Sequence, residues 1–280
     1  MSEPSMVARE RGNALEQVFG RKERVLIGVV HLLPLPGSPD FSGSEVEAIY
    51  ERALADARAY GAAGFDGLIV ENHGDIPFTK PDDIGPETAA HMAVAADRIR
   101  RETNLPIGVN VLANAALHAL AVASAAGARF VRVNQWANAY VANEGLIEGA
   151  APRATRYRRE LGAQRVRIFA DVHVKHGAHA IVQDRPIAEL VRDVEFFNAD
   201  VVIATGQRTG HAANLAYIET IKSATSLPVL VGSGATSENI REMLGIVDGA
   251  IVASALKVEG RWWNPVDPMR AKGFVLHARS

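Results

Sequence analysis

Residues 229–239 read VLVGSGATSEN, a short apolar run that leads into a Gly-Ser-Gly turn. Glycines in such a turn let the backbone approach an anion closely, and amides at a following helix start would point toward it. Residues 249–257, GAIVASALK, form a second apolar run followed by small residues. Barrels of alternating strands and helices often hold a phosphate on the loops after their last two strands. The two segments therefore predict a phosphate cradle formed by Gly232, Ser233, Gly234, Ala253 and Ser254.

A structural explanation of the same turn stays open. The glycines could simply permit a tight bend, with Ser237 as the helix N-cap and Glu238 in the first turn. A dinucleotide fold is disfavoured because the third glycine of its motif is absent and the turn lies near the end of the chain.

Eight apolar, β-rich runs recur along the chain, and stretches with helical spacing, such as 44–63 and 87–101, separate them. The runs cover residues 25–30, 67–70, 106–111, 130–134, 166–172, 200–204, 228–231 and 249–252. Continuous apolar strands between helices indicate a parallel sheet, either doubly wound or closed into a barrel. Eight units within 280 residues favour a single (β/α)8 TIM barrel over residues 25–280, preceded by a short N-terminal extension over residues 1–24.

Composition excludes several classes of function. The 30 Lys and Arg residues nearly balance the 32 Asp and Glu residues, so no strong field would attract nucleic acid. The chain contains no cysteine, which excludes disulfides and thiolate chemistry and is compatible with the cytoplasm. No run reaches the ~18 apolar residues of a membrane span, so we expect no integral membrane segment.

Polar residues alternate with apolar ones in residues 169–175, FADVHVK. With a side-chain period of two, Asp171, His173 and Lys175 share one face of the strand. If that face is the barrel interior, an acid, an imidazole and an amine meet at the mouth, an arrangement suited to proton transfer. A solvated polar row at a strand end is the alternative interpretation.

Other strand ends add candidates. The first strand leads to His31, and the second ends in Glu71 and Asn72, of which one faces inward depending on the register. Four residues are predicted to hydrogen-bond a substrate, although asparagine also forms turns: Asn72, Asn110, Asn134 and Thr205. Arg208 is a further candidate for a phosphate or carboxylate clamp.

A divalent metal is a weaker alternative. His31, Glu71, Asp171 and His173 carry suitable ligand atoms. A metal-dependent amidohydrolase barrel would show His-x-His at the first strand, whereas this chain reads His31-Leu32-Leu33. We therefore assign no metal ligand and no organic cofactor, and leave a divalent metal open.

Several segments resemble the BtpA/SgcQ family from about residue 25 onward. They are IGVVHLLPLPGSP (27–39), GLIVENHGDIP (67–77), VRVNQW (131–136), DVHVK (171–175) and VGSGATSEN (231–239). The resemblance implies a barrel of the ribulose-phosphate-binding group. It also implies two kinds of role, photosystem I biogenesis in photosynthetic bacteria and sugar or nucleoside metabolism elsewhere.

The first functional hypothesis is an enzyme that acts on a small phosphorylated sugar or nucleoside-derived metabolite by isomerase, aldolase or lyase chemistry. Asp171 and His173 would exchange a proton, while Lys175, Glu71 and His31 would polarise the substrate or relay protons. Two alternatives are a metal-assisted hydrolase and an assembly factor that binds a protein through an apolar surface such as Trp262-Trp263. A homo-oligomer is expected in the cytoplasm.

Overall fold

The eight apolar runs form one closed barrel of parallel strands in the computed structural model, which describes residues 12–43, 45–205 and 215–280. Ile27 of the first strand is in register with Gly67 of the second and with Ile251 of the last, which closes the barrel and excludes an open doubly wound sheet. The strands are β1 (Val25–His31), β2 (Gly67–Glu71), β3 (Ile107–Asn110), β4 (Phe130–Val133), β7 (Arg167–Asp171), β8 (Val201–Ala204), β9 (Val229–Val231) and β10 (Gly249–Val252). The predicted (β/α)8 barrel is confirmed.

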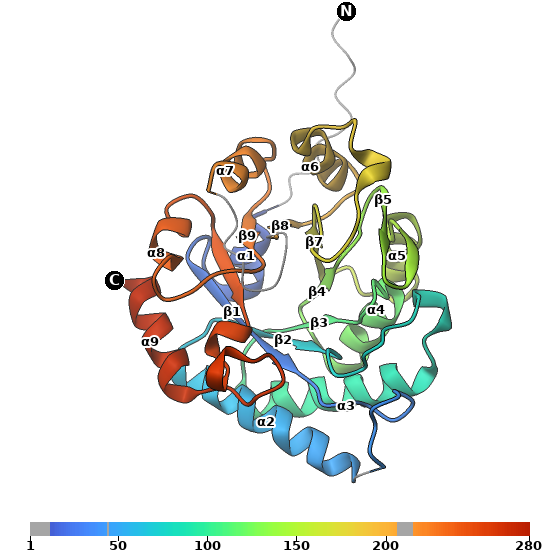
Figure 1. The fold of residues 1–280 in the computed structure, drawn as a ribbon, viewed down its shortest axis with the longest axis vertical. Helices are drawn as coiled ribbons and strands as arrows, with labels where there is room; N and C mark the ends of the chain where they lie inside the picture. The colour runs from blue at the N-terminus through green and yellow to red at the C-terminus, as the bar shows by residue number, and fades with distance from the viewer. Residues whose placement is uncertain (1–11, 44, 206–214) are drawn as a thin grey trace, which may run out of the picture.

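Helices surround the strands, and α9, the last helix, lies beside α2, the helix that follows β1 (Figure 1). The outer helices are α2 (Val46–Ala63), α3 (Pro86–Thr103), α4 (Ala116–Ala126), α5 (Ala151–Glu160), α6 (Ile187–Phe196), α7 (Leu215–Ser223), α8 (Ile240–Met243) and α9 (Pro268–Arg279). Short 3-10 helices lie in the loops at Pro81–Asp83, Ala180–Val182, Ser254–Leu256 and Val258–Gly260. None of the helices in the described part of the chain has the length and apolar character needed to cross a bilayer.

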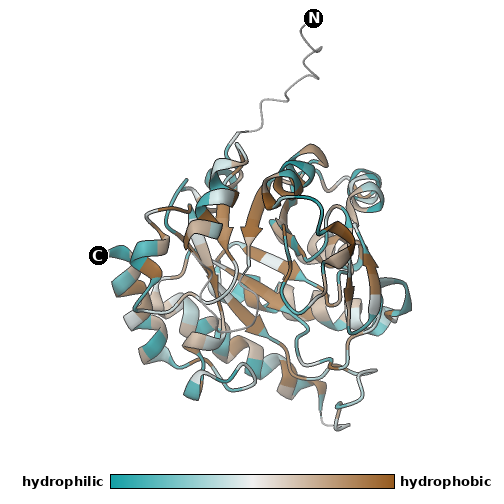
Figure 2. Cartoon of the chain, turned by 45° about the horizontal axis from the view of Figure 1, so that its top comes forward, coloured by the Kyte–Doolittle hydropathy of each residue, from teal (hydrophilic) through white to brown (hydrophobic). Residues whose placement is uncertain are grey.

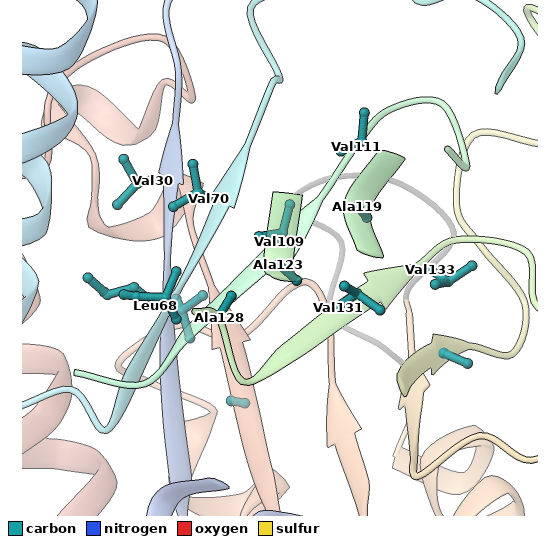
Figure 3. Packing of buried hydrophobic residues seen from close by; sticks show 14 of the residues in the cluster. Val30, Leu68, Val70, Val109, Val111, Ala119, Ala123, Ala128, Val131 and Val133 are labelled. Atoms are coloured by element: carbon teal, nitrogen blue, oxygen red, sulfur yellow. The ribbon is translucent and has the colours of Figure 1, made fainter. Parts of the chain in front are cut away.

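Strand alternation produces two separate apolar cores. Outward side chains such as Val109 and Val131 pack against the small residues Ala119 and Ala123 of α4 (Figure 3). Inward side chains, including Ile69 and the other members of a second cluster, fill the barrel itself. Figure 2 shows the result as apolar strands at the centre and more hydrophilic helices around them.

The N-terminal extension contributes a helix, α1 (Ala14–Phe19), which packs onto the interior cluster of the barrel. Its Phe19 ring lies 5.5 Å from Phe130, at the first position of β4. The helix therefore covers the amino-terminal end of the barrel and leaves the carboxyl-terminal end available for a site.

The stretch 135–150 between β4 and α5 contains an antiparallel hairpin of β5 (Ala139–Ala142) and β6 (Gly145–Glu148). Val141 of the hairpin pairs with Ala178, and Tyr140 stacks on His179 at 5.3 Å between ring centroids. The hairpin thus braces the loop that follows β7.

A buried ion pair fixes the segment after β10. The Lys257 side chain is fully buried, and its Nζ lies 2.6 Å from Asp56 Oδ2 of α2. The other carboxylate oxygen of Asp56 accepts a hydrogen bond from the Val266 amide at 2.8 Å. Both ends of the segment 257–266 are therefore attached to the same carboxylate.

Lys257→Met should destabilise the fold by about 3–5 kcal/mol, because it removes the buried cation of Asp56 and leaves the carboxylate only the longer 3.6 Å contact with Arg52. Urea unfolding of the full chain measures this loss. Lys22→Met is the matched control, since Lys22 and Glu16 are 63% and 54% exposed and such a pair contributes under about 1 kcal/mol. An equally small loss for both variants would contradict the role given to Lys257.

Candidate active site at the carboxyl end of the barrel

A cavity of about 240 Å³ opens at the carboxyl-terminal end of the strands. Its described lining combines ionisable side chains with the small residues that follow β9 and β10. The lining residues are Val29, His31, Glu71, His73, Arg132, Lys175, Gly232, Ser233, Gly234, Ala235, Thr236, Ile251, Val252, Ala253, Ser254, Ala255, Gly260 and Trp262. All five predicted cradle residues and three of the five predicted catalytic residues, His31, Glu71 and Lys175, therefore face one space.

Local geometry favours glycine at two positions of the loop after β9. A Cβ on Gly232 would lie 2.5 Å from Ile203 Cγ2, and Gly234 adopts a φ of +76°. Asn239 closes the loop, because its side chain donates to the Gly234 carbonyl at 2.9 Å and accepts from the Thr236 amide at 2.8 Å.

The alternative, structural explanation of this turn, with Ser237 as the helix N-cap, is wrong about the helix start. Helix α8 begins at Ile240, has Asn239 at its N-cap position and is only four residues long. An anion in the cradle would therefore meet the amides of the loop itself, and a helix dipole would contribute little.

The strand register answers the question left open between Glu71 and Asn72. Ile69 belongs to the barrel interior, so Glu71, two residues later on β2, also points inward. Asn72 points away from the cavity, accepts from the Leu112 amide at 2.8 Å and donates to Asp75 at 3.0 Å.

Glu71 is the centre of a hydrogen-bonded group. Its Oε2 accepts from Asn110 at 2.6 Å, and its Oε1 accepts from His73 Nδ1 at 3.1 Å. Burial by itself raises the pKa of the Glu71 carboxyl, but the hydrogen bond from His73 and the positive charge around the carboxylate, that of Arg132 included, outweigh it, so the pKa is lowered overall. Glu71 is therefore a carboxylate at neutral pH.

His31 lies beside this group at the end of β1. Its Nδ1 is 3.1 Å from the Trp262 carbonyl oxygen, and its ring stacks on His73 with 4.6 Å between centroids. Burial lowers the pKa of His31 to about 3, although the charge of Glu71 opposes the shift. At neutral pH His31 is therefore a neutral imidazole. Because a carbonyl can only accept, its Nδ1 carries the proton.

Arg132 and Asp171 form a buried bidentate pair. The Arg132 Nε and Nη2 atoms donate to the two Asp171 oxygens at 3.1 and 3.0 Å, and Asn134 donates to the same carboxylate at 3.2 Å. Arg132 lines the cavity, whereas Asp171 is not among its described lining residues. In this position Asp171 orients the guanidinium.

The alternation predicted for residues 169–175 ends with β7 at Asp171. Beyond that point the chain turns, and the His173 ring stacks on His179 with 3.7 Å between centroids. Lys175 still lines the cavity, half-buried, whereas His173 is not among the described lining residues. Burial, and to a lesser extent the charge of Arg132, lowers the pKa of Lys175.

Three of the four predicted substrate-binding residues hold other residues of the site in place. Asn110 holds Glu71, Asn134 holds Asp171, and Thr205 donates to the His173 carbonyl at 2.7 Å. With Asn72, none of them is among the described residues that line the cavity. Arg208 lies outside the described residues.

Sequence reasoning gave no committed role to Arg132, His73 or Trp262. Arg132 had a usable signal, because it occupies an inward position in the otherwise apolar strand FVRV. Trp262 was noticed only as half of a possible protein-binding pair, because its approach to the cavity depends on the Lys257–Asp56 attachment.

Comparison with known proteins identifies the family and supports the barrel fold. A model of the BtpA family matches residues 22–280. An uncharacterised protein of Pyrococcus abyssi is 42% identical over 91% of this chain and 96% of its own length. The photosystem I biogenesis protein BtpA of Synechocystis is 41% identical over 89% of this chain and 86% of its own.

Among solved structures, N-(5'-phosphoribosyl)anthranilate isomerase from Pyrococcus furiosus superposes with a TM-score of 0.57. The match covers 91% of this chain and 98% of the isomerase, at 15% sequence identity. At that identity the likeness concerns the fold.

The neutral state of His31 predicts loss of stability in acid. With a folded pKa of about 3 and an unfolded pKa near 6.5, the unfolded chain binds an extra proton as the pH falls through this window. Between pH 6.5 and 5 this coupling should cost about 2 kcal/mol. Urea unfolding at several pH values should show a shallower acid dependence for His31→Gln than for the unaltered chain.

Proposed function

Because the chain belongs to the BtpA family and its cavity joins a small-residue loop to an amine and a carboxylate, we propose that it is an enzyme of phosphorylated metabolites. The substrate class is a small phosphorylated sugar or nucleoside-derived compound. The observation that carries the proposal is the shared cavity, in which the cradle after β9 and β10 faces Lys175 and Glu71.

The phosphate would bind to backbone amides of the two loops. Gly232 and Gly234 keep side-chain carbon away from the anion, and Ser254 adds a hydroxyl from the opposite loop. Arg132 lies next to this loop, since a Cβ on Gly232 would be 3.4 Å from its Nη2. A guanidinium already oriented by Asp171 is well suited to contact a phosphate or carboxylate oxygen.

Lys175 is the best placed proton-transfer group. Within the described residues it has no ion-pair or hydrogen-bond partner, and its lowered pKa increases the fraction of neutral amine near pH 7. A neutral amine can remove the proton from a carbon next to a carbonyl, and the resulting ammonium can return it to a neighbouring atom. Isomerase, aldolase and lyase reactions share this step.

The other candidate residues would have electrostatic or positioning roles around Lys175. Glu71 provides a fixed negative charge beside the reacting region, and Asp171 acts through Arg132. His173, whose ring stacks on His179, would have a smaller part than the order of residues along the strand predicts.

The solved isomerase is named for a phosphoribosyl compound, and as a protein of the same fold it is consistent with the proposed substrate class. The Synechocystis relative is named for photosystem I biogenesis, so an assembly role is the second candidate function. Trp262 lines the cavity, so only Trp263 of the aromatic pair remains on the surface for a partner. A cytoplasmic location and a homo-oligomeric state stay predictions.

Ser254→Asp should weaken phosphate binding by at least about tenfold, because it adds a negative charge to the cradle. Calorimetric titration with inorganic phosphate and a pentose phosphate measures the change. Ser223→Asp, with the same charge change at the amino-terminal side of β9, should leave the affinity unaltered. Equal affinities in both variants would contradict the cradle.

Lys175→Met should lower the rate of proton exchange about 10²- to 10⁴-fold while the chain stays folded, because it removes the amine and keeps the side-chain volume. The assay follows deuterium incorporation next to the carbonyl in a panel of phosphorylated ketoses by NMR. His173→Ala, tested beside it, should have a smaller effect. A larger effect of His173→Ala would assign the proton transfer to the histidine instead.

A further inference from the structure

His31, Glu71 and His73 each present one potential ligand atom, and these atoms all lie within 4.8 Å of one another. We propose that these three side chains bind a divalent transition-metal ion, such as Zn²⁺ or Mn²⁺, in the cavity beside the phosphate cradle. The set differs from the one considered from sequence, because Asp171 is paired with Arg132 and the His173 ring stacks on His179.

The distances fit a shared coordination sphere. Two ligand atoms about 2.1 Å from a metal and about 110° apart are about 3.4 Å from each other. Glu71 Oε1 lies 3.5 Å from His31 Nε2 and 3.1 Å from His73 Nδ1. The carboxylate oxygen and the two imidazole nitrogens could therefore bind one ion, provided that the His73 ring carries its proton on Nε2 and frees Nδ1 from its hydrogen bond to Glu71.

The tautomer of His31 supplies an independent argument. Its Nδ1 lies 3.1 Å from the Trp262 carbonyl oxygen, which can only accept, so Nε2 is the ring nitrogen left to bind a metal. This Nε2 lies 3.5 Å from Glu71 Oε1, a separation at which one cation could contact both atoms.

Two further residues hold the ligands in the way that metal sites require. Asn110 donates to Glu71 Oε2 at 2.6 Å, which leaves Oε1 as the oxygen directed at both histidines. The Trp262 carbonyl fixes the tautomer and the ring orientation of His31. Outer contacts of this kind accompany most histidine and carboxylate ligands of protein-bound metals.

Three protein ligands leave coordination positions for a substrate oxygen. Two imidazoles with one carboxylate suit Zn²⁺, Mn²⁺ and neighbouring transition metals better than Mg²⁺, which prefers oxygen ligands. Asp171 neutralises the nearby Arg132, which limits the repulsion of a cation. The ion would polarise a carbonyl or hydroxyl of the substrate whose phosphate lies in the cradle.

This site deepens the proposed function without resting on it, because metal binding and phosphate binding use different residues. Titration of Zn²⁺, Mn²⁺ and Mg²⁺ into the metal-stripped full chain, followed by calorimetry, should give one site per chain for the first two ions and weaker binding of Mg²⁺. The ligand-field absorption of added Co²⁺ reports the same site spectroscopically.

His73→Ala should weaken Zn²⁺ binding more than about 100-fold, and Asn110→Ala about 10- to 100-fold. His73 has a partly exposed side chain, so its removal should leave folding intact even if Glu71→Gln does not fold. His91→Ala, a histidine bonded to Tyr50 outside the cavity, is the matched control and should bind Zn²⁺ as the unaltered chain does.

Absence of saturable binding, or an unchanged affinity in His73→Ala, would overturn the metal site. Two crossed measurements separate its failure from failure of the proposed function. Ser254→Asp should lose phosphate without any weakening of Zn²⁺ binding, because an added carboxylate repels an anion and attracts a cation, and His73→Ala should keep inorganic phosphate while it loses Zn²⁺. Loss of both ligands in His73→Ala would also count against the separate site.

Discussion

A closed barrel of eight parallel strands leaves each strand side chain only two directions, into the barrel or out toward the helices. Inward positions must fill the interior, so they are apolar along most of each strand, as Ile69 and Phe169 are. At the last inward position the interior ends, and polar residues such as Glu71 and Asp171 replace the apolar ones. The polar mouth of the cavity is a direct result of this geometry.

Charges so close to an apolar interior are stable only when each has a partner. Arg132 and Asp171 satisfy each other, and Asn110 and His73 satisfy Glu71. The same requirement acts outside the barrel, where Asp56 holds Lys257 and with it the segment that brings Trp262 to the site. Lys175 differs, since within the described residues it faces the cavity without an ion-pair partner.

The strand positions were predictable because apolar, β-rich runs with regular spacing leave few alternatives. The cradle residues followed from the Gly-Ser-Gly turn after one such run and the small residues after the next, and all of them line the cavity. Prediction failed where the strand period ends: His173 was assigned inward by alternation, but β7 stops two residues earlier. The role of Trp262 could not be found in this way, because a contact across 231 residues depends on how the last loop packs on α2.

The hydrogen bond between His31 and the Trp262 carbonyl joins the first strand to the segment after the last. On the ribosome, the amino-terminal strands emerge well before this segment, and domains tend to fold as units once enough chain is available. A nascent chain shorter than about 262 residues therefore lacks one wall of the cavity, whatever structure its strands have already formed. A product truncated between β10 and Trp262 would therefore carry every strand of the barrel and an incomplete cavity.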